Sequence, residues 1–344
     1  MLLPILLSGL RYVVGVDYWS YDEKFHFVAD AGWGDLISMW GQAYWNYIEP
    51  SFFLIAKLTS LITESSWLLF TTYAAITVIG FYAGIIKTKS RYMALMVFIF
   101  LLFFFPQSFN AVRQLAAMAV IFYATICLLN GGKGRHFIVL NIAAALLHYT
   151  AIIYLPLGCI YMWLRSKGTL KHVRIKHTMA SILIILGSII IGYFATLYVP
   201  VLGKFKVALA TMMESSITMT AWISTLLNNL IKFGFVALFY NKIIALRPEA
   251  RFYFFLFAIG TSLFLLFPIS HVFFFRVSLY FTIFFVVLLP MLLEVIKSRR
   301  LRYLMATGII VFGVASFIRS NYYYDSIHIM PYNSVFDKAR EGQL

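Results

Sequence analysis

Apolar runs long enough to cross a lipid bilayer recur along nearly the whole sequence, and this feature restricts the fold more than any other. A transmembrane helix needs about 20 consecutive, mainly apolar residues. The sequence is 62% hydrophobic and only 12% charged, and its apolar runs lack the alternation of a half-buried strand. Backbone groups inside hydrocarbon must also satisfy their own hydrogen bonds, as they do in a helix. The sequence therefore predicts an all-α polytopic integral membrane protein and excludes a soluble domain.

The apolar runs divide into about eleven predicted transmembrane helices within a single domain, residues 1–344. A further apolar segment, residues 51–62, is too short to cross and is interrupted by Lys57, which is typical of an interfacial or re-entrant helix. In this arrangement residues 16–50 form an outer-face loop, and residues 319–344 form an outer-face tail. The predicted crossings are residues 1–10, 67–86, 92–106, 110–129, 136–148, 150–164, 178–199, 222–246, 252–268, 272–296 and 303–318.

The basic residues cluster in five short loops, and this distribution explains the formal net charge of +15. Cytoplasmic loops of membrane proteins carry an excess of lysine and arginine, so these loops are predicted to be cytoplasmic. The charge is then a topology signal, and nucleic acid is excluded as a partner. Basic loops on both sides of residues 136–164 also require two short helices that turn near His148. The five clusters are residues 87–91, 133–135, 165–176, 242–251 and 297–302.

With this topology, ionisable residues at the ends of apolar segments converge on the outer face. They are Arg11, Asp17, Asp22, Glu49, Arg113, His148, His271, Arg276 and Arg319. An arginine inside a membrane segment costs about a few kcal/mol or more, so it marks a functional site by default. The alternative is a structural arginine that pairs with a carboxylate or caps a helix.

Two of these arginines begin predicted helices, which favours a phosphate site. Arg113, followed by Gln114, opens one helix after a break at residues 106–108, and Arg276 opens another, with Tyr280 one turn later. A guanidinium binds phosphate through two parallel hydrogen bonds, and a helix N-terminus adds positive potential. The pair therefore predicts a diphosphate site at the lipid–water boundary. For Arg276 the alternative is an anchor that reaches the lipid headgroups.

His148 is the candidate base, because imidazole titrates near neutrality and can remove a proton from a hydroxyl. Asp17 and Glu49 are competing candidates, and a hydrogen-bonded structural histidine is the alternative reading. The sequence has no Walker loop, GxGxxG motif or nucleophile elbow. Cys127 and Cys159 lie in apolar segments without neighbouring ligands, so no metal, cofactor or disulfide is predicted. This residue set favours transfer from a polyprenyl phosphate or diphosphate, in which phosphate leaves and a base activates a hydroxyl.

Short motifs spread over the chain match one family in order. They are Gly15-x-Asp17-Tyr18-x-x-Tyr21, Glu49-Pro50-x-Phe52, Arg113-Gln114, His148-Tyr149-Thr150-Ala151, Arg276 with Tyr280 and Phe281, and Pro331-Tyr332. On these motifs the chain resembles the EpsG-like branch of bacterial Wzy-type polysaccharide polymerases, the O-antigen, capsule and exopolysaccharide polymerases of the inner membrane. It departs from the family in having a short first helix and Ser51 where a glycine often follows Glu-Pro.

The resemblance implies a glycosyltransferase with GT-C-like architecture and an active site facing the periplasm. Such an enzyme moves the growing glycan from undecaprenyl diphosphate to the nonreducing end of an incoming undecaprenyl-diphosphate-linked repeat unit. A chain-length regulator is an expected partner, and the reaction needs no cofactor. The implied residues are Arg113, Gln114 and Arg276 at the diphosphate, His148, Asp17 or Glu49 in catalysis, and Tyr21, Tyr280 and Tyr332 along the glycan.

Four other functions stay open at this point. A polyprenyl-monophosphate-sugar glycosyltransferase would show an acidic pair in its first external loop, as Asp17 and Asp22 do. A secondary transporter would carry its charges at the midplane between inverted repeats, and the sequence shows no convincing repeat. A membrane O-acyltransferase takes its donor from the cytoplasm, against the outward topology. A lipid-linked glycan flippase needs charges across the full membrane thickness, which these spans lack.

Overall fold

The computed structural model describes residues 1–41, 48–168, 218–268, 270–323, 325 and 327–337. In this part of the chain the elements are helical, and the only pairing of extended backbone is an isolated antiparallel bridge between Arg11 and Ser334. Four helices are long and apolar enough to cross a membrane, or five if one bent pair is a single span. This number agrees with the predicted polytopic helical membrane protein, but it does not confirm eleven crossings. The expected crossing at residues 178–199 lies outside the described residues.

The chain divides into two compact units. Unit 1 comprises Met1–Ile160 and Tyr303–Leu344, and unit 2 comprises Tyr161–Arg302. Unit 2 contains α12 (Met219–Ala237), α13 (Tyr240–Leu246), α14 (Ala250–Leu263), α15 (His271–Thr282) and α16 (Phe285–Val295). The predicted crossing at residues 222–246 is broken, because α12 and α13 meet at an angle of 53°. Stacked rings join α14 to the start of α16, with ring centroids 5.5 Å apart for Tyr253 and Phe284 and 5.3 Å apart for Phe257 and Phe285. The single predicted domain stays a prediction.

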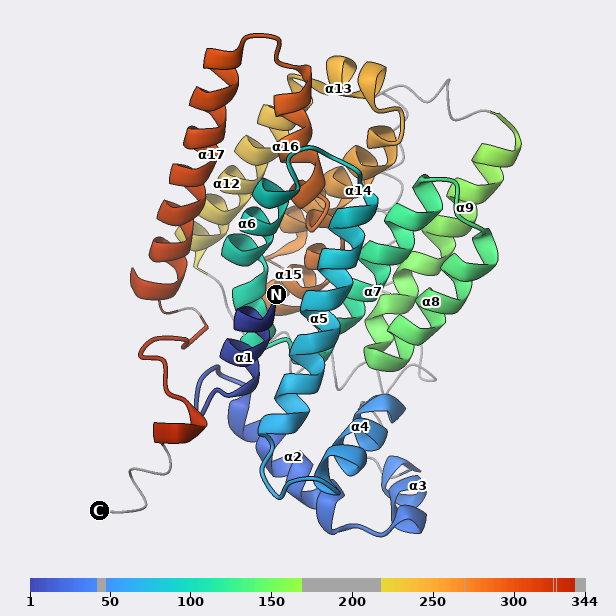
Figure 1. Ribbon diagram of the computed structural model, residues 1–344, viewed down its shortest axis with the longest axis vertical. Helices are drawn as coiled ribbons and strands as arrows, with labels where there is room; N and C mark the ends of the chain where they lie inside the picture. The colour runs from blue at the N-terminus through green and yellow to red at the C-terminus, as the bar shows by residue number, and fades with distance from the viewer. Residues whose placement is uncertain (42–47, 169–217, 269, 324, 326, 338–344) are drawn as a thin grey trace. The chain divides into compact units, whose positions relative to one another are not determined.

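Unit 1 is built around a buried central helix. Its upright helices are α5 (Trp67–Lys87), α6 (Met93–Phe103), α7 (Val112–Leu129), α8 (Gly134–Leu147), the start of α9 (Tyr154–Ser166) and most of α17 (Arg299–Ile318), with α1 (Leu2–Gly9) beside α5 (Figure 1). In α7, 78% of the most apolar 18-residue stretch is buried, because α5 and α8 pack along this helix. Phe81 of α5 and Phe122 of α7 meet with ring centroids 5.1 Å apart. Helix α7 therefore supports α5 and α8, the two helices that pack along it.

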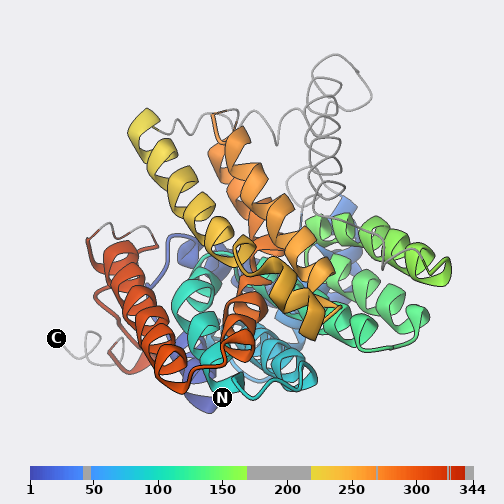
Figure 2. The same cartoon turned by 90° about the horizontal axis from the view of Figure 1, so that it is seen from above.

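The chain turns back at His148, as the charge rule predicts. Helix α8 ends at Leu147, His148 is extended with φ −158° and ψ 118°, and α9 follows a short 3-10 turn at Tyr149–Ile153. A Cβ on Gly158 would lie 1.9 Å from the ring of Phe137. Because these positions are nearly equidistant from His148, α8 and α9 form an antiparallel hairpin, and they lie side by side when seen from above (Figure 2). The prediction of two short helices is confirmed.

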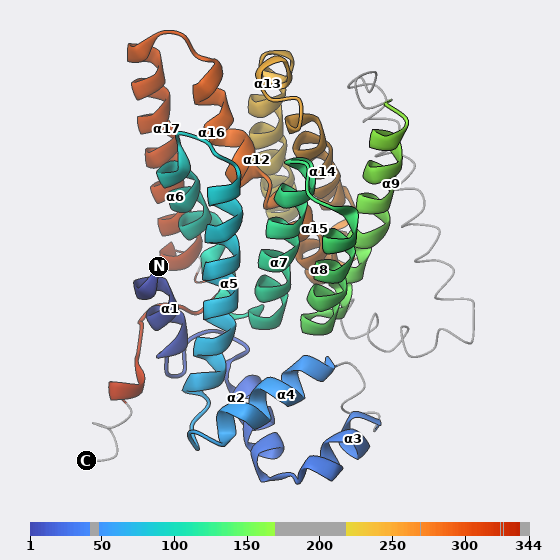
Figure 3. The same cartoon turned by 45° about the vertical axis from the view of Figure 1, so that its right-hand side comes forward.

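The described part of the predicted outer loop is mainly helical. Helices α2 (Tyr18–Asp30), α3 (Trp33–Gly41) and α4 (Pro50–Ser60) gather at one end of α5, α7 and α8 (Figure 3). Helix α4 has 11 residues, or about 16 Å at 1.5 Å per residue, so it is too short to cross the hydrocarbon. This agrees with the short helix expected at residues 51–62.

Lys57, which interrupts the apolar run of α4, has a structural role. Its Nζ donates hydrogen bonds to the backbone carbonyls of Ala29 (2.8 Å) and Ala31 (2.6 Å) at the C-terminal end of α2. A cation is stabilising there because the last carbonyls of a helix lack partners and carry partial negative charge. Lys57 therefore ties α4 to α2.

Candidate functional site

Arg113 lies at a helix start because a proline breaks the apolar run before it. Helix α6 ends at Phe103, Pro106 lies in a 3-10 turn at Phe105–Phe109, and α7 begins at Val112. Proline has no N–H to donate within a helix, so a continuous helix through this run would lose a hydrogen bond. The break places the guanidinium in the first turn of α7.

Glu49 is buried although it carries a carboxylate. It precedes Pro50, the first residue of α4, and proline keeps the preceding backbone extended, here with φ −68° and ψ 145°. The carboxylate makes no capping hydrogen bond to its own helix. It is turned instead toward the start of α7 and the end of α8, and only 1% of the side chain is exposed.

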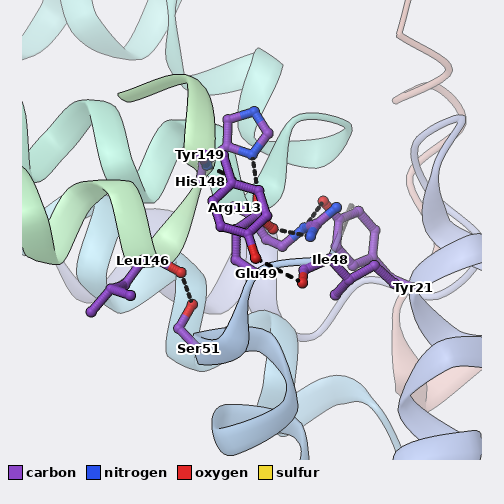
Figure 4. Close-up of polar contacts among 8 residues, drawn as sticks. All are labelled: Tyr21, Ile48, Glu49, Ser51, Arg113, Leu146, His148 and Tyr149. Atoms are coloured by element: carbon purple, nitrogen blue, oxygen red, sulfur yellow. Dashed lines mark hydrogen bonds and ion pairs between the residues drawn. The ribbon is translucent and has the colours of Figure 1, made fainter. Parts of the chain in front are cut away.

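The two carboxylate oxygens of Glu49 have different partners. Oε2 accepts a hydrogen bond from Nη1 of Arg113, and Oε1 lies 2.6 Å from Nδ1 of His148 (Figure 4). Oε1 also accepts from the backbone N–H of Tyr149 at 3.1 Å. Nε of Arg113 donates to the hydroxyl of Tyr21 at 3.3 Å. We call Tyr21, Glu49, Arg113, His148 and Tyr149 the Glu49 cluster; all five residues belong to unit 1.

The charge of Glu49 determines which nitrogen of His148 carries a proton. Burial alone would raise the pKa of Glu49, but the hydrogen bond from His148 and the charge of Arg113 hold this pKa below its ordinary value. The carboxylate is therefore ionised at neutral pH and can only accept hydrogen bonds. It follows that Nδ1 of His148 donates to Glu49, and Nε2 is left to act as an acceptor in the neutral ring. The His148 side chain is 20% exposed, so part of the ring is accessible.

Two further contacts hold the cluster in place. The hydroxyl of Ser51 donates to the carbonyl of Leu146 at 2.6 Å, which joins the start of α4 to the end of α8. The guanidinium carbon of Arg113 lies 5.6 Å from the ring centroids of both Tyr21 and Phe52. Aromatic faces attract a cation at this distance, so the rings orient Arg113 in addition to its hydrogen bonds.

Gly15 positions α2 against the break before α7. Its φ is +97°, and a Cβ there would lie 2.5 Å from the carbonyl oxygen of Phe109 and 2.8 Å from Oδ1 of Asn110. The same Oδ1 accepts a hydrogen bond from the backbone N–H of Val16 at 2.7 Å. The turn therefore requires glycine, and it brings Tyr21 to Arg113.

Replacing Gly15 by alanine is expected to lower the free energy of unfolding by about 2 kcal/mol. The alanine would be strained at a positive φ, and its Cβ would clash with the backbone of Phe109. The displaced α2 should also weaken the contact between Tyr21 and Arg113. Thermal melting of the purified protein measures the first effect. Gly34→Ala is the matched control, since a Cβ at Gly34 meets no atom within 4 Å. Equal melting temperatures for the two variants would contradict this account.

The roles of the other predicted site residues stay predictions. Asp17 directly precedes α2, and Gln114 is buried within α7 at 2% exposure. The hydroxyl of Tyr332 donates to the carbonyl of Leu7 at 2.9 Å, so it ties the tail to α1. Arg276 and Tyr280 lie on α15 of unit 2. Among the described residues, no group of three or more His, Cys, Asp and Glu side chains is placed to hold a metal.

A protein-family model described as the EpsG family matches residues 1–334. The chain belongs to the EpsG family. The match includes every member of the Glu49 cluster and indicates a membrane protein with a polysaccharide polymerase-type function. Comparisons with curated proteins and with solved structures gave no match for this EpsG-family chain.

The sequence presented Glu49 and His148 as competing bases, and the structure shows that their side chains are joined by a hydrogen bond. It also gave Tyr21 as a glycan contact; the hydroxyl of Tyr21 accepts a hydrogen bond from Arg113, and its role toward a glycan stays a prediction. The backbone N–H of Tyr149 was not foreseen, because a main-chain donor leaves no signal in residue type.

Proposed function

We propose that this EpsG-family protein is a polysaccharide repeat-unit polymerase of the bacterial inner membrane. Its two substrates are oligosaccharide repeat units carried on undecaprenyl diphosphate at the periplasmic face. The growing glycan leaves its lipid carrier and joins the nonreducing end of the incoming unit. The observation that carries this proposal is the buried, ionised Glu49 that holds an imidazole and a guanidinium together.

In the proposed reaction His148 is the base and Glu49 orients it. A hydroxyl of the incoming unit attacks the anomeric carbon of the donor, and its proton passes to Nε2 of His148. The bond between the anomeric carbon and the diphosphate oxygen breaks, and undecaprenyl diphosphate leaves with the electron pair. The carboxylate of Glu49 keeps the proton of the resting imidazole on Nδ1 and stabilises the imidazolium that forms.

The diphosphate contacts belong to the same proposal. Arg113 lies at the N-terminus of α7, where backbone N–H groups add positive potential. Arg276 and Gln114 are the further proposed ligands, and Tyr280 and Tyr332 the proposed glycan contacts. The eleven crossings, the GT-C-like architecture and a chain-length regulator as partner are finer parts of the proposal, as is an O-antigen, capsule or exopolysaccharide product.

A glycosyltransferase that uses a polyprenyl-monophosphate sugar is the competing function. The acidic pair that would favour it includes Asp22, whose carboxylate accepts a hydrogen bond from Ser66 and lies 3.7 Å from Nε2 of His26. Asp22, one residue of the acidic pair, is therefore already in contact with Ser66 and His26. A lipid-linked glycan transporter is the other alternative, and it would need no base in contact with a sugar hydroxyl.

The length distribution of lipid-linked glycan tests the function. Deleting the gene should reduce a ladder of products to material with one repeat unit, and restoring the gene should rebuild the ladder. An unchanged ladder would contradict polymerisation. Loss of all repeat units from the outer face would indicate a transporter instead.

A further inference from the structure

Arg11 carries a buried guanidinium whose hydrogen-bonding capacity is only partly used. The side chain has no exposed surface and lies between α1 and α2, outside the candidate spans. Its Nη1 donates to the carbonyl and to the hydroxyl of Ser8, both at 3.2 Å. Nε and Nη2 have no hydrogen-bond partner among the described residues.

The charge of Arg11 is not paired with a carboxylate in the part of the chain that the structure describes. The guanidinium carbon lies 4.1 Å from the ring centroid of Phe70 and 5.2 Å from that of Phe109. These ring faces offset part of the lost hydration. Burial lowers the pKa of Arg11 to about 10, so the group stays protonated at neutral pH. A buried cation with two N–H groups that donate no hydrogen bond is unfavourable unless an anion binds to it.

Arg11 and Arg113 both lie near Tyr21. The Tyr21 hydroxyl accepts a hydrogen bond from Arg113, and Tyr21 also interacts electrostatically with Arg11. Arg113 forms an ion pair with Glu49, whereas Arg11 forms none with a carboxylate of the described residues. Arg11 is therefore a buried positive charge near the Glu49 cluster with no ion pair in the described part of the chain, and the carboxylate of Asp17 acts on it only from beyond ion-pair distance.

We propose that the Nε and Nη2 edge of Arg11 binds a phosphate group, and that this group belongs to the diphosphate of a lipid-linked substrate. The two N–H groups on that edge are parallel and match two oxygens of one phosphate. Arg11 also follows the apolar helix α1 by two residues, so it lies where an apolar segment ends. The identity of the lipid rests on the proposed function, whereas the anion site rests on Arg11 alone.

The C-terminal segment 327–335 covers the loop that carries Arg11. The N–H of Tyr12 donates to the carbonyl of Asn333 (2.9 Å), and the N–H of Val335 donates to the carbonyl of Leu10 (2.8 Å). The Tyr332 hydroxyl adds its bond to Leu7. Since the Arg11 side chain is fully enclosed, the phosphate group enters when this segment separates from residues 10–15.

The test measures melting temperature and affinity for the full-length protein in detergent, with inorganic pyrophosphate or undecaprenyl diphosphate added. The wild type should melt at a higher temperature with the anion, and Arg11→Met should lose this rise. Arg11→Met should also bind about tenfold more weakly or worse, because hydrogen bonds to a charged group are lost. Arg91→Met is the matched control, since Arg91 is exposed and lies over the ring of Tyr92.

Each further result supports or overturns the proposal. Without the anion, Arg11→Met should melt at or above the wild-type temperature, because an apolar side chain replaces an unpaired buried charge. A response to both probes means that phosphate oxygens suffice, and a response to the lipid alone assigns the site to a lipid-borne group. Absence of any wild-type response, or an equal response in Arg11→Met, overturns it.

A second pair of variants covers the case in which Arg11→Met does not fold. Arg11→Lys keeps the charge but loses the two parallel N–H donors of Nε and Nη2, so it should bind pyrophosphate about tenfold more weakly. Tyr332→Phe releases one bond of the covering segment and should bind the anion more tightly. Wild-type affinity in Arg11→Lys overturns the site. This assay measures binding and involves no glycan transfer, so a negative result does not bear on the polymerase proposal. Conversely, the absence of a glycan ladder does not bear on the anion site.

Discussion

Replacing Glu49 by glutamine is expected to slow glycan lengthening by roughly 100-fold or more, since removing a group that orients a catalytic base has effects of this size. An amide is neutral, so it no longer favours the proton on Nδ1 of His148 or stabilises an imidazolium. It also leaves the guanidinium of Arg113 without its carboxylate. The measurement is the rate at which purified protein lengthens lipid-linked glycan, normalised to folded protein on size exclusion.

The control for this variant is Glu64→Gln, which makes the same chemical change at an exposed carboxylate of the predicted outer face. Its rate should equal that of the wild type. The loss in Glu49→Gln has two sources, because breaking a buried ion pair also destabilises a protein by about 3 kcal/mol. Normalisation to folded protein separates them. A normal rate in Glu49→Gln at normal folding would remove Glu49 from the mechanism.

Replacing Arg113 by lysine is expected to reduce glycan lengthening by about 100-fold, although the charge is kept. The guanidinium reaches the Tyr21 hydroxyl through Nε and the Glu49 carboxylate through Nη1. A single ammonium group has no fork that spans both. The predicted result is normal membrane insertion with glycans limited to one or a few repeat units, measured by gel analysis of lipid-linked material.

A double variant tests whether Arg113 and Glu49 act as one unit. If they do, Glu49→Gln combined with Arg113→Lys should be little worse than either single variant, because residues in one network are not additive. Arg91→Lys is the control for the arginine change, since Arg91 is exposed. Losses that multiply in the double variant would show that the two residues act separately.

The helix breaks near the site were predictable because their causes are local. Pro106 divides the apolar run before Arg113, and Pro50 starts the short helix after Glu49. The turn at His148 followed from basic residues on both sides of residues 136–164. The number of membrane crossings was less accessible, because helices shorter than a bilayer are common in this chain and hydropathy does not show how they combine.

The partners of the charged groups were not predictable in the same way. Glu49 lies 64 positions from Arg113 and 99 positions from His148 in the chain. No local spacing rule joins residues so far apart. The sequence therefore presented His148 and Glu49 as alternatives, whereas packing of α4 against α7 and α8 makes them partners.

The sequence by itself determined that this is a helical membrane protein of the EpsG family, where its helices break, and which residue types carry its motifs. Those properties depend on hydropathy, proline chemistry and charge, which each residue contributes wherever it lies. Only the tertiary structure decided which charges are paired and which are not. It paired Arg113 with Glu49, and it buried Arg11 without an ion pair to any carboxylate of the described residues, because ion pairing depends on distance and burial, and both are set by packing.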